Sequence, residues 1–79
     1  MTTEVHYFGI IAEKIGVNSE QIMLDTEHDS IDLRAYFEQK YPVLIELEFK
    51  IAVNQEFVEQ IEVGAAPSEI ALLPPFAGG

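Results

Sequence analysis

The chain of 79 residues has the length of one small domain, which we assign to residues 1–79. It has no cysteine, and this excludes a disulfide framework, a thiolate metal site and a cysteine nucleophile. Fourteen acidic residues against four basic ones give a formal net charge of −10, a surface that repels nucleic-acid phosphates and attracts a basic partner.

The N-terminal part of the chain predicts two strands separated by a short helix. Residues 5–11 are rich in aromatic and β-branched side chains, as a strand is. Residues 12–15 form a short helical turn that ends at Gly16, and residues 20–24 form a second strand. A polar turn over residues 25–29 follows, so these elements make a hairpin-like opening pair.

The main helix is predicted after this turn. Its apolar stripe has helical spacing and consists of Leu33, Tyr36, Phe37 and Tyr41. Asp29 or Ser30 can cap the first amides, and Asp32 lies in the first turn, where a negative charge suits the helix dipole. Pro42 disfavours helical geometry at Tyr41, so we expect the helix to end there after about three turns.

The C-terminal half predicts three more strands. Residues 49–53 alternate as a strand does, residues 54–56 form a tight turn, and residues 57–58 begin the returning strand. Residues 64–68 are a loop, and residues 69–73 are the last strand. This order of elements predicts an α+β fold, a mixed sheet of about five strands with the helix across one face, and it is compatible with a β-grasp.

A short tail, residues 74–79, follows the last strand. Pro74 and Pro75 end the strand and hold the chain extended, and Gly78 and Gly79 have no side chains. Six extended residues reach about 20 Å, so this tail can project its carboxylate into a narrow cleft of another protein. Glycine-rich ends also arise by chance, but the stiffening prolines and the final glycine favour a functional tail.

The tail and the strand before it resemble the C-terminus of a known family. The ending Pro-Pro-Phe-Ala-Gly-Gly (residues 74–79) is similar to that of the molybdopterin synthase sulfur-carrier subunits, which are ubiquitin-like β-grasp proteins. Residues 52–55, and Phe8, Glu13 and Gly16 at their spacing, match the same family. The similarity covers essentially the whole chain.

Two places depart from that family. Residues 64–68 lack its acidic-Gly-Asp turn, and Ala12 stands where an arginine is common. Related sulfur carriers for thiamine synthesis share the two glycines but usually lack the double proline, so Pro74 and Pro75 favour the molybdopterin branch. Both departures concern partner contacts more than the chemistry of the tail.

The resemblance implies a sulfur-transfer mechanism. An E1-like enzyme that uses ATP would adenylate Gly79, and sulfur would replace AMP to give a C-terminal thiocarboxylate. The large subunit of molybdopterin synthase would bind the inserted tail in a heterotetramer, and cyclic pyranopterin monophosphate would receive the sulfur. The inserted residues would be Pro74, Pro75, Phe76, Ala77 and Gly78. The chain itself would bind no cofactor and would not catalyse a reaction alone.

Strand alternation predicts a docking patch beside the tail. If Ile70 and Leu72 face the helix, Leu73 faces away, and the same alternation turns Val5 and Tyr7 inward and Phe8 outward. We also expect Phe57 outward and Val58 inward. The resemblance implies that Phe8, Phe57 and Leu73 bind the partner, and the alternative is that one or more of them lies in the core.

Other functions remain open at this stage. The chain could be a thiamine-pathway carrier, a ubiquitin-like modifier joined through Gly79 to lysines, or a binding module with an inert tail. His6 and His28 have no metal-ligand spacing, so no metal site is predicted. Because no signal peptide or membrane-length apolar run is visible, we expect a cytoplasmic protein that binds neither membrane nor nucleic acid.

Overall fold

The computed structural model of the chain describes residues 2–75. Its elements in chain order are β1 (Thr2–Tyr7), α1 (Gly9–Ile15), β2 (Ser19–Met23), β3 (Ile31–Asp32), α2 (Leu33–Lys40), the 3-10 helix η1 (Pro42–Glu46), β4 (Lys50–Val53), β5 (Glu56–Phe57), β6 (Gln60–Ile61) and β7 (Glu69–Leu73). The last strand has the bounds that the sequence predicts.

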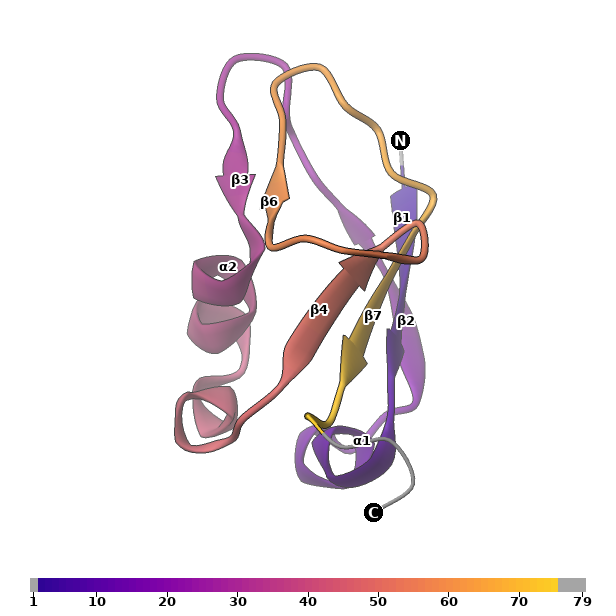
Figure 1. The fold of residues 1–79 in the computed structure, drawn as a ribbon, viewed down its shortest axis with the longest axis vertical. Coiled ribbons are helices and arrows are strands. Elements are labelled where there is room, and N and C mark those ends of the chain that lie inside the picture. Colours follow the sequence, from indigo (N-terminus) through magenta and orange to yellow (C-terminus); the bar gives the residue numbers. More distant parts are fainter. Residues whose placement is uncertain (1, 76–79) are drawn as a thin grey trace.

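The main sheet has the strand order β2-β1-β7-β4-β5. β1 runs parallel to β7, and the remaining neighbours are antiparallel, so the sheet is mixed. Helix α2 lies beside this sheet, and β3 pairs with β6 in a small second sheet next to it (Figure 1). The predicted α+β fold is confirmed.

The core lies between α2 and one face of the sheet. Its fully or almost fully buried side chains alternate along the strands and recur on α2, and they include Val5, Tyr7, Leu33, Phe37, Ile51, Ile70 and Leu72. Every second side chain of these strands points to the opposite face of the sheet. In Figure 1 no helix of residues 2–75 lies over that face. That uncovered face carries the candidate site.

A partly buried carboxylate joins three elements at the edge of the core. The hydroxyls of Tyr7 and Tyr41 both donate to Oε2 of Glu20, each at 2.5 Å, and Lys40 Nζ lies 3.9 Å from Oε1. Burial alone would raise the pKa of Glu20, but the two hydrogen bonds and the lysine charge outweigh it, so this pKa is lowered. Burial and the bond to Glu20 raise the pKa of Tyr7 well above its ordinary value and that of Tyr41 to about 12.

The first strand is shorter than predicted, and the first helix is longer. β1 ends at Tyr7 because Gly9 has a φ of +58° and interrupts the extended backbone. The amide of Ile11 then donates to the carbonyl of Phe8 at 3.2 Å, which begins the turn of α1. The helix buries Ile11 completely, although the sequence predicts this residue to be the last of the first strand.

Helix α2 begins later than predicted and spans about two turns. Residues 31–32 pair with β6, so the predicted caps Asp29 and Ser30 lie before this strand and Asp32 is the cap itself. Its Oδ1 accepts from the amide of Ala35 at 3.2 Å. The helix gives way at Tyr41, as Pro42 predicts.

The turn between β4 and β5 is confirmed, and it has a second role. Asn54 and Gln55 have φ angles of +47° and +71°, and the strand resumes at Glu56, one residue earlier than predicted. Oδ1 of Asn54 accepts from the amide and the hydroxyl of Ser68 and from the amide of Glu69, at 3.0 to 3.1 Å. The turn therefore holds the start of β7. Neither η1 nor β6 is predicted by the sequence.

Candidate docking face and base of the tail

The tail leaves the sheet at the end of β7, next to the start of α1. The amide of Phe8 donates to the carbonyl of Leu72 at 3.1 Å, so the hydrogen bonding of β1 with β7 continues one residue past the end of β1. Pro74 then packs against Gly9, where an added β-carbon would lie 3.1 Å from Pro74 Cγ. The glycine provides both the positive φ and the space for this contact.

Part of the predicted tail lies outside the described residues. Pro74 and Pro75 are described, and both are partly buried. The backbone bends at Pro75, so the extended course predicted through both prolines is not kept there. The predicted inserted residues Phe76, Ala77 and Gly78, and the predicted reacting residue Gly79, lie outside the described part of the chain.

The uncovered side of the main sheet presents aligned rows of side chains. One row crosses four strands, because Phe57 pairs with Ala52, Ala52 with Ala71, and Ala71 with His6. In the next row Lys50 pairs with Leu73, and Phe8 follows β1 beside it. We call this surface the open face, and it consists of His6, Phe8, Lys50, Ala52, Phe57, Ala71 and Leu73.

The three predicted partner-binding residues all lie on the open face. Phe8 is 46% exposed and Phe57 is 69% exposed, while Leu73 is partly buried at the point where the tail begins. None of the three lies in the core, and two small alanines, Ala52 and Ala71, lie between Phe57 and His6 in the row across the sheet. The prediction for Val58 is wrong, because β5 ends at Phe57 and Val58 is 42% exposed rather than turned inward.

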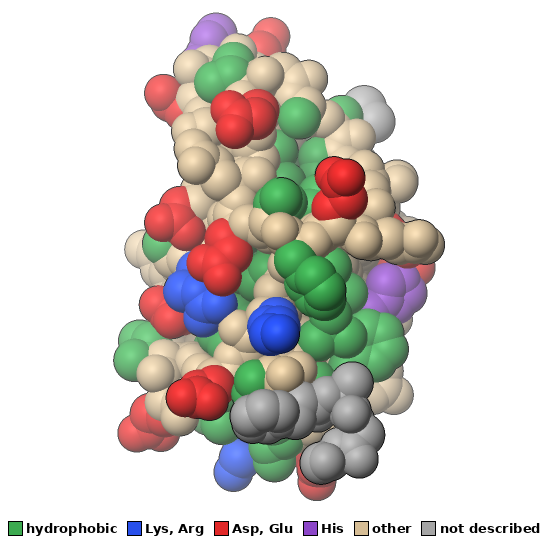
Figure 2. Space-filling model, in the orientation of Figure 1, with side chains coloured by type: hydrophobic (Ala, Val, Ile, Leu, Met, Phe, Trp, Pro, Cys, Tyr) green, Lys and Arg blue, Asp and Glu red, His purple; other side chains and the backbone are tan. Residues whose placement is uncertain are grey.

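The open face is apolar with charges inside and around it. Figure 2 shows hydrophobic side chains gathered over the lower half of this view, with a basic side chain among them. Lys50 Nζ lies 5.6 Å from the ring centroid of Phe57, within range of a cation–π contact. His6 Nε2 lies 3.0 Å from Oε1 of Glu4, beside the ring of Phe8. Such a surface suits a specific protein partner better than bulk solvent.

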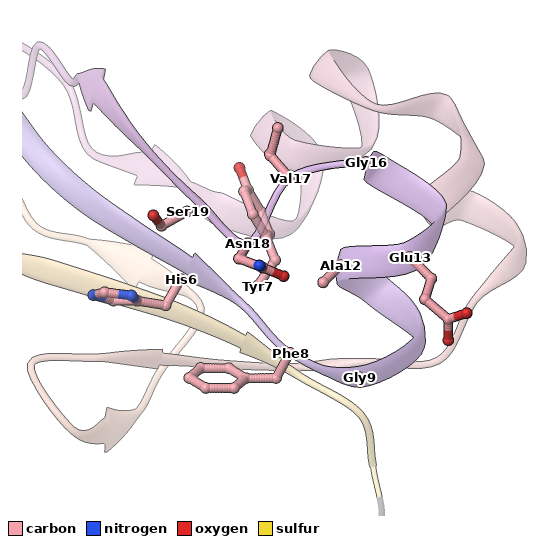
Figure 3. A pocket seen from close by; sticks show the side chains of 10 residues that line it. All are labelled: His6, Tyr7, Phe8, Gly9, Ala12, Glu13, Gly16, Val17, Asn18 and Ser19. Carbon is pink, nitrogen blue, oxygen red and sulfur yellow. The ribbon is translucent and has the colours of Figure 1, made fainter.

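A groove extends the open face beyond β1. It has a volume of about 620 Å³ and is bounded by the end of β1, by α1 and by the loop from α1 to β2. Figure 3 shows Phe8 and His6 on one side and Ala12 on the helix that borders the other. Phe8 belongs to both surfaces, so a partner that covers the open face can also reach Val17 in the groove, which is 44% exposed.

Several residues of this region are missed by the sequence reasoning. Gly9 falls inside the stretch predicted as a strand, although a glycine in a strand pattern often marks a bend or a close backbone approach. Strand alternation alone would place Lys50 on the open face. Its contact with Phe57 depends on the pairing of β4 with β5. The groove depends on the position of α1, which sequence periodicity does not give.

Two further kinds of site are not found among the described residues. Within residues 2–75 no group of three or more His, Cys, Asp or Glu side chains is placed to hold a metal ion. In the same part of the chain no helix is long and apolar enough to cross a membrane.

A β-grasp sheet with one uncovered apolar face beside a C-terminal tail defines a ubiquitin-like protein. The fold is similar to that of small archaeal modifier protein 1 from Haloferax volcanii, with a TM-score of 0.69 and 22% identity over 95% of this chain and 98% of that chain. At this level of identity the likeness concerns the fold alone.

The family follows from sequence comparison. The chain belongs to the ThiS family, whose model matches residues 5–79. It is 40% identical to the molybdopterin synthase sulfur carrier subunit of Homo sapiens, over 96% of this chain and 92% of that protein. It is 31% identical to the protein of the same name from Caenorhabditis briggsae, over 100% of this chain and 99% of that protein. The predicted resemblance is confirmed.

Proposed function

We propose that this chain is the sulfur-carrier small subunit of a molybdopterin synthase. The observation that carries the proposal is the 40% identity with the human sulfur carrier subunit over nearly the full length of both proteins. The match of the family model extends through residue 79, so the tail belongs to the shared sequence. We place the protein in the cytoplasm, with its substrate and partners.

The proposed chemistry takes place at the carboxylate of Gly79. A carboxylate is a poor electrophile, so an E1-like enzyme first joins one of its oxygens to the α-phosphorus of ATP and releases pyrophosphate. A sulfur nucleophile at the oxidation level of hydrosulfide then attacks the carbonyl carbon, AMP leaves with its bridging oxygen, and loss of the proton on sulfur gives a thiocarboxylate. The large subunit transfers this sulfur to cyclic pyranopterin monophosphate. Gly78 has no side chain, which leaves the activating enzyme access to the carbonyl.

The described residues support this role by their arrangement at the base of the tail. Pro74 rests on Gly9 at the edge of the open face, so a partner that binds this face is also next to the tail. We propose that Phe8, Phe57 and Leu73 dock the large subunit while residues 74–78 enter its cleft. Two carriers bound to a dimer of large subunits would give the heterotetramer. In this arrangement the large subunit provides the catalytic side chains, and the carrier provides the sulfur.

Intact mass spectrometry of the protein co-expressed with its activating enzyme tests the proposal. A fraction of the chains should gain the mass difference between sulfur and oxygen, and the gain should map to Gly79. A variant that lacks Gly79 should fold with an unchanged melting temperature but should gain no sulfur. Protein that never acquires a thiocarboxylate would contradict the proposal, and isopeptide-linked adducts in its place would identify a protein modifier.

Genetic complementation separates the two sulfur pathways. In a strain that lacks its own molybdopterin synthase carrier, the chain should restore a molybdenum-dependent activity. In a strain that lacks the thiamine carrier it should not restore growth without thiamine. The opposite pattern would assign the chain to thiamine synthesis.

A further inference from the structure

Lys50 is the basic residue of the open face. It begins β4, pairs with Leu73 across the strand interface, and is exposed. Its Nζ lies 5.6 Å from the ring centroid of Phe57. The ammonium group therefore lies between two of the residues that we propose to dock the partner, close to the start of the tail.

The surroundings of Lys50 differ from those of Arg34 and Lys40, each of which has a carboxylate close by. Arg34 makes two hydrogen bonds to Glu59, at 2.8 and 2.9 Å, and Lys40 lies 3.9 Å from Glu20. Lys14 occupies the last turn of α1, the end of the helix where a cation is favoured. Within residues 2–75, no carboxylate lies within 4.0 Å of Lys50 Nζ.

This placement is unusual in a chain with a formal net charge of −10. Glu4 and Glu69 lie outside the open face, where they pair in register near the start of β1 and β7, and Glu4 contacts His6. The cation of Lys50 thus lies beside aromatic and aliphatic side chains near the start of the tail, and the acidic residues lie around the open face. A partner must match both the cation and the acidic residues.

Docking removes water from the ammonium group of Lys50. A buried charge is strongly unfavourable unless an opposite charge with good geometry replaces its hydration. The ring of Phe57 compensates only in part. We infer that the partner surface over the open face carries a carboxylate that pairs with Lys50 between Phe57 and Leu73. This inference rests on the proposed function, because the partner is the large subunit of molybdopterin synthase.

Such a carboxylate would also select the partner. Because the chain has a large negative net charge, most of its surface attracts basic proteins nonspecifically. A single acidic group, surrounded by apolar side chains and placed to meet Lys50, would fix the register of docking and reject basic proteins that lack it. The alternative is that the flexible stem of Lys50 carries its ammonium group to water at the rim of the interface.

Binding of the purified large subunit to three variants at Lys50 distinguishes these arrangements. Lys50→Met keeps an apolar stem and removes the charge, so it should weaken binding by about tenfold if the partner carries the paired carboxylate. Lys50→Glu should weaken binding further, and Lys50→Arg should stay within about threefold of the wild type. Lys14→Met removes the same charge from α1 and should leave the affinity unchanged.

Each outcome has a separate meaning. If Lys50→Met binds as tightly as the wild type or more tightly, the paired carboxylate is absent and the inference is wrong. An equal loss in Lys14→Met would show a general effect of net charge, which also overturns it. If the wild type itself does not bind the large subunit while the chain is well folded, the proposed function fails instead.

Discussion

Pro74 packs on Gly9, and an added β-carbon on Gly9 would lie 3.1 Å from Pro74 Cγ. Gly9 also adopts a φ of +58°, which L side chains rarely take. One residue thus ends the first strand, opens the first helix and gives the tail its starting position. The contact therefore links the start of α1 to the first residue after β7.

Gly9→Val should impair sulfur transfer more than it impairs folding. The β-branched side chain is strained at positive φ, which costs about 1–3 kcal/mol of stability, and it also displaces Pro74. Because small misplacements of a reacting group are costly, we expect the rate of sulfur delivery to fall by about tenfold or more. Thermal unfolding and single-turnover transfer to the pterin precursor measure the two effects.

Gly64→Val is the matched control for this prediction. Gly64 has a φ of +81° with no heavy atom within 4 Å of an added β-carbon, so the variant carries the backbone strain without the contact. It should lose similar stability and keep its transfer rate. Equal loss of rate in both variants would show that strain, and not the position of Pro74, is responsible.

Glu20→Gln should destabilise the domain by about 1–3 kcal/mol. The amide oxygen can still accept from Tyr7 and Tyr41, but the negative charge is lost, and hydrogen bonds to a charged group are stronger than neutral ones. Urea unfolding measures the change. Glu13→Gln, on the exposed side of α1, should stay within about 0.5 kcal/mol of the wild type.

The same carboxylate makes the domain sensitive to acid. The pKa of Glu20 is lower in the folded state than the value of about 4.3 in an unfolded chain. A lowered pKa contributes stability above the unfolded value, and this contribution is lost as the pH falls through the folded value. The unfolding free energy of the wild type should therefore fall more steeply below pH of about 4 than that of Glu20→Gln. Parallel acid limbs would contradict this assignment.

Alkaline pH should destabilise the domain through the tyrosines. The pKa of Tyr41 is raised to about 12, chiefly by burial and then by its hydrogen bond to Glu20. A raised pKa favours the folded state fully below the unfolded value of about 10, and this advantage is lost as the pH rises through the folded value. Tyr41→Phe should lose part of this alkaline dependence. Tyrosinate absorbance recorded during unfolding measures it, and ionisation before unfolding would disprove the prediction.

Phe57→Ala should separate docking from stability. Phe57 is 69% exposed, so truncation should change the unfolding free energy by less than about 0.5 kcal/mol. If the open face binds the large subunit, the same change should weaken binding by about tenfold or more. Ile45→Ala is the control, because Ile45 lies on η1 and is 65% exposed. An equal loss in both variants would argue against the open face.

Sequence periodicity predicts the long-range plan of this fold better than its short elements. The alternation over residues 69–73 gives the bounds and both faces of β7, because that strand is buried on one side along its length. β3 and β6 are two residues each and are defined only by their pairing with one another. No local sequence pattern predicts these two strands. Because β3 takes up residues 31–32, the cap of α2 is Asp32 and not the predicted Asp29 or Ser30.

The same distinction separates the residues of the candidate site that the sequence predicts from those that it does not. Phe8, Phe57 and Leu73 follow from alternation within single strands, and all three reach the predicted face. The prediction for Val58 fails because alternation has no meaning after a strand ends. The contact of Gly9 with Pro74 joins residues far apart in sequence, and only the parallel pairing of β1 with β7 brings them together.

The central position of β7 has a consequence for how the protein is made. β7 is inserted between β1 and β4, yet it is translated after both of them. A growing chain can form only the local hairpins until this strand is complete, since long-range pairing waits for its partner. The step that closes the sheet also seats Pro74 on Gly9. Any protein that requires the complete open face can therefore bind only after β7 has been translated and paired.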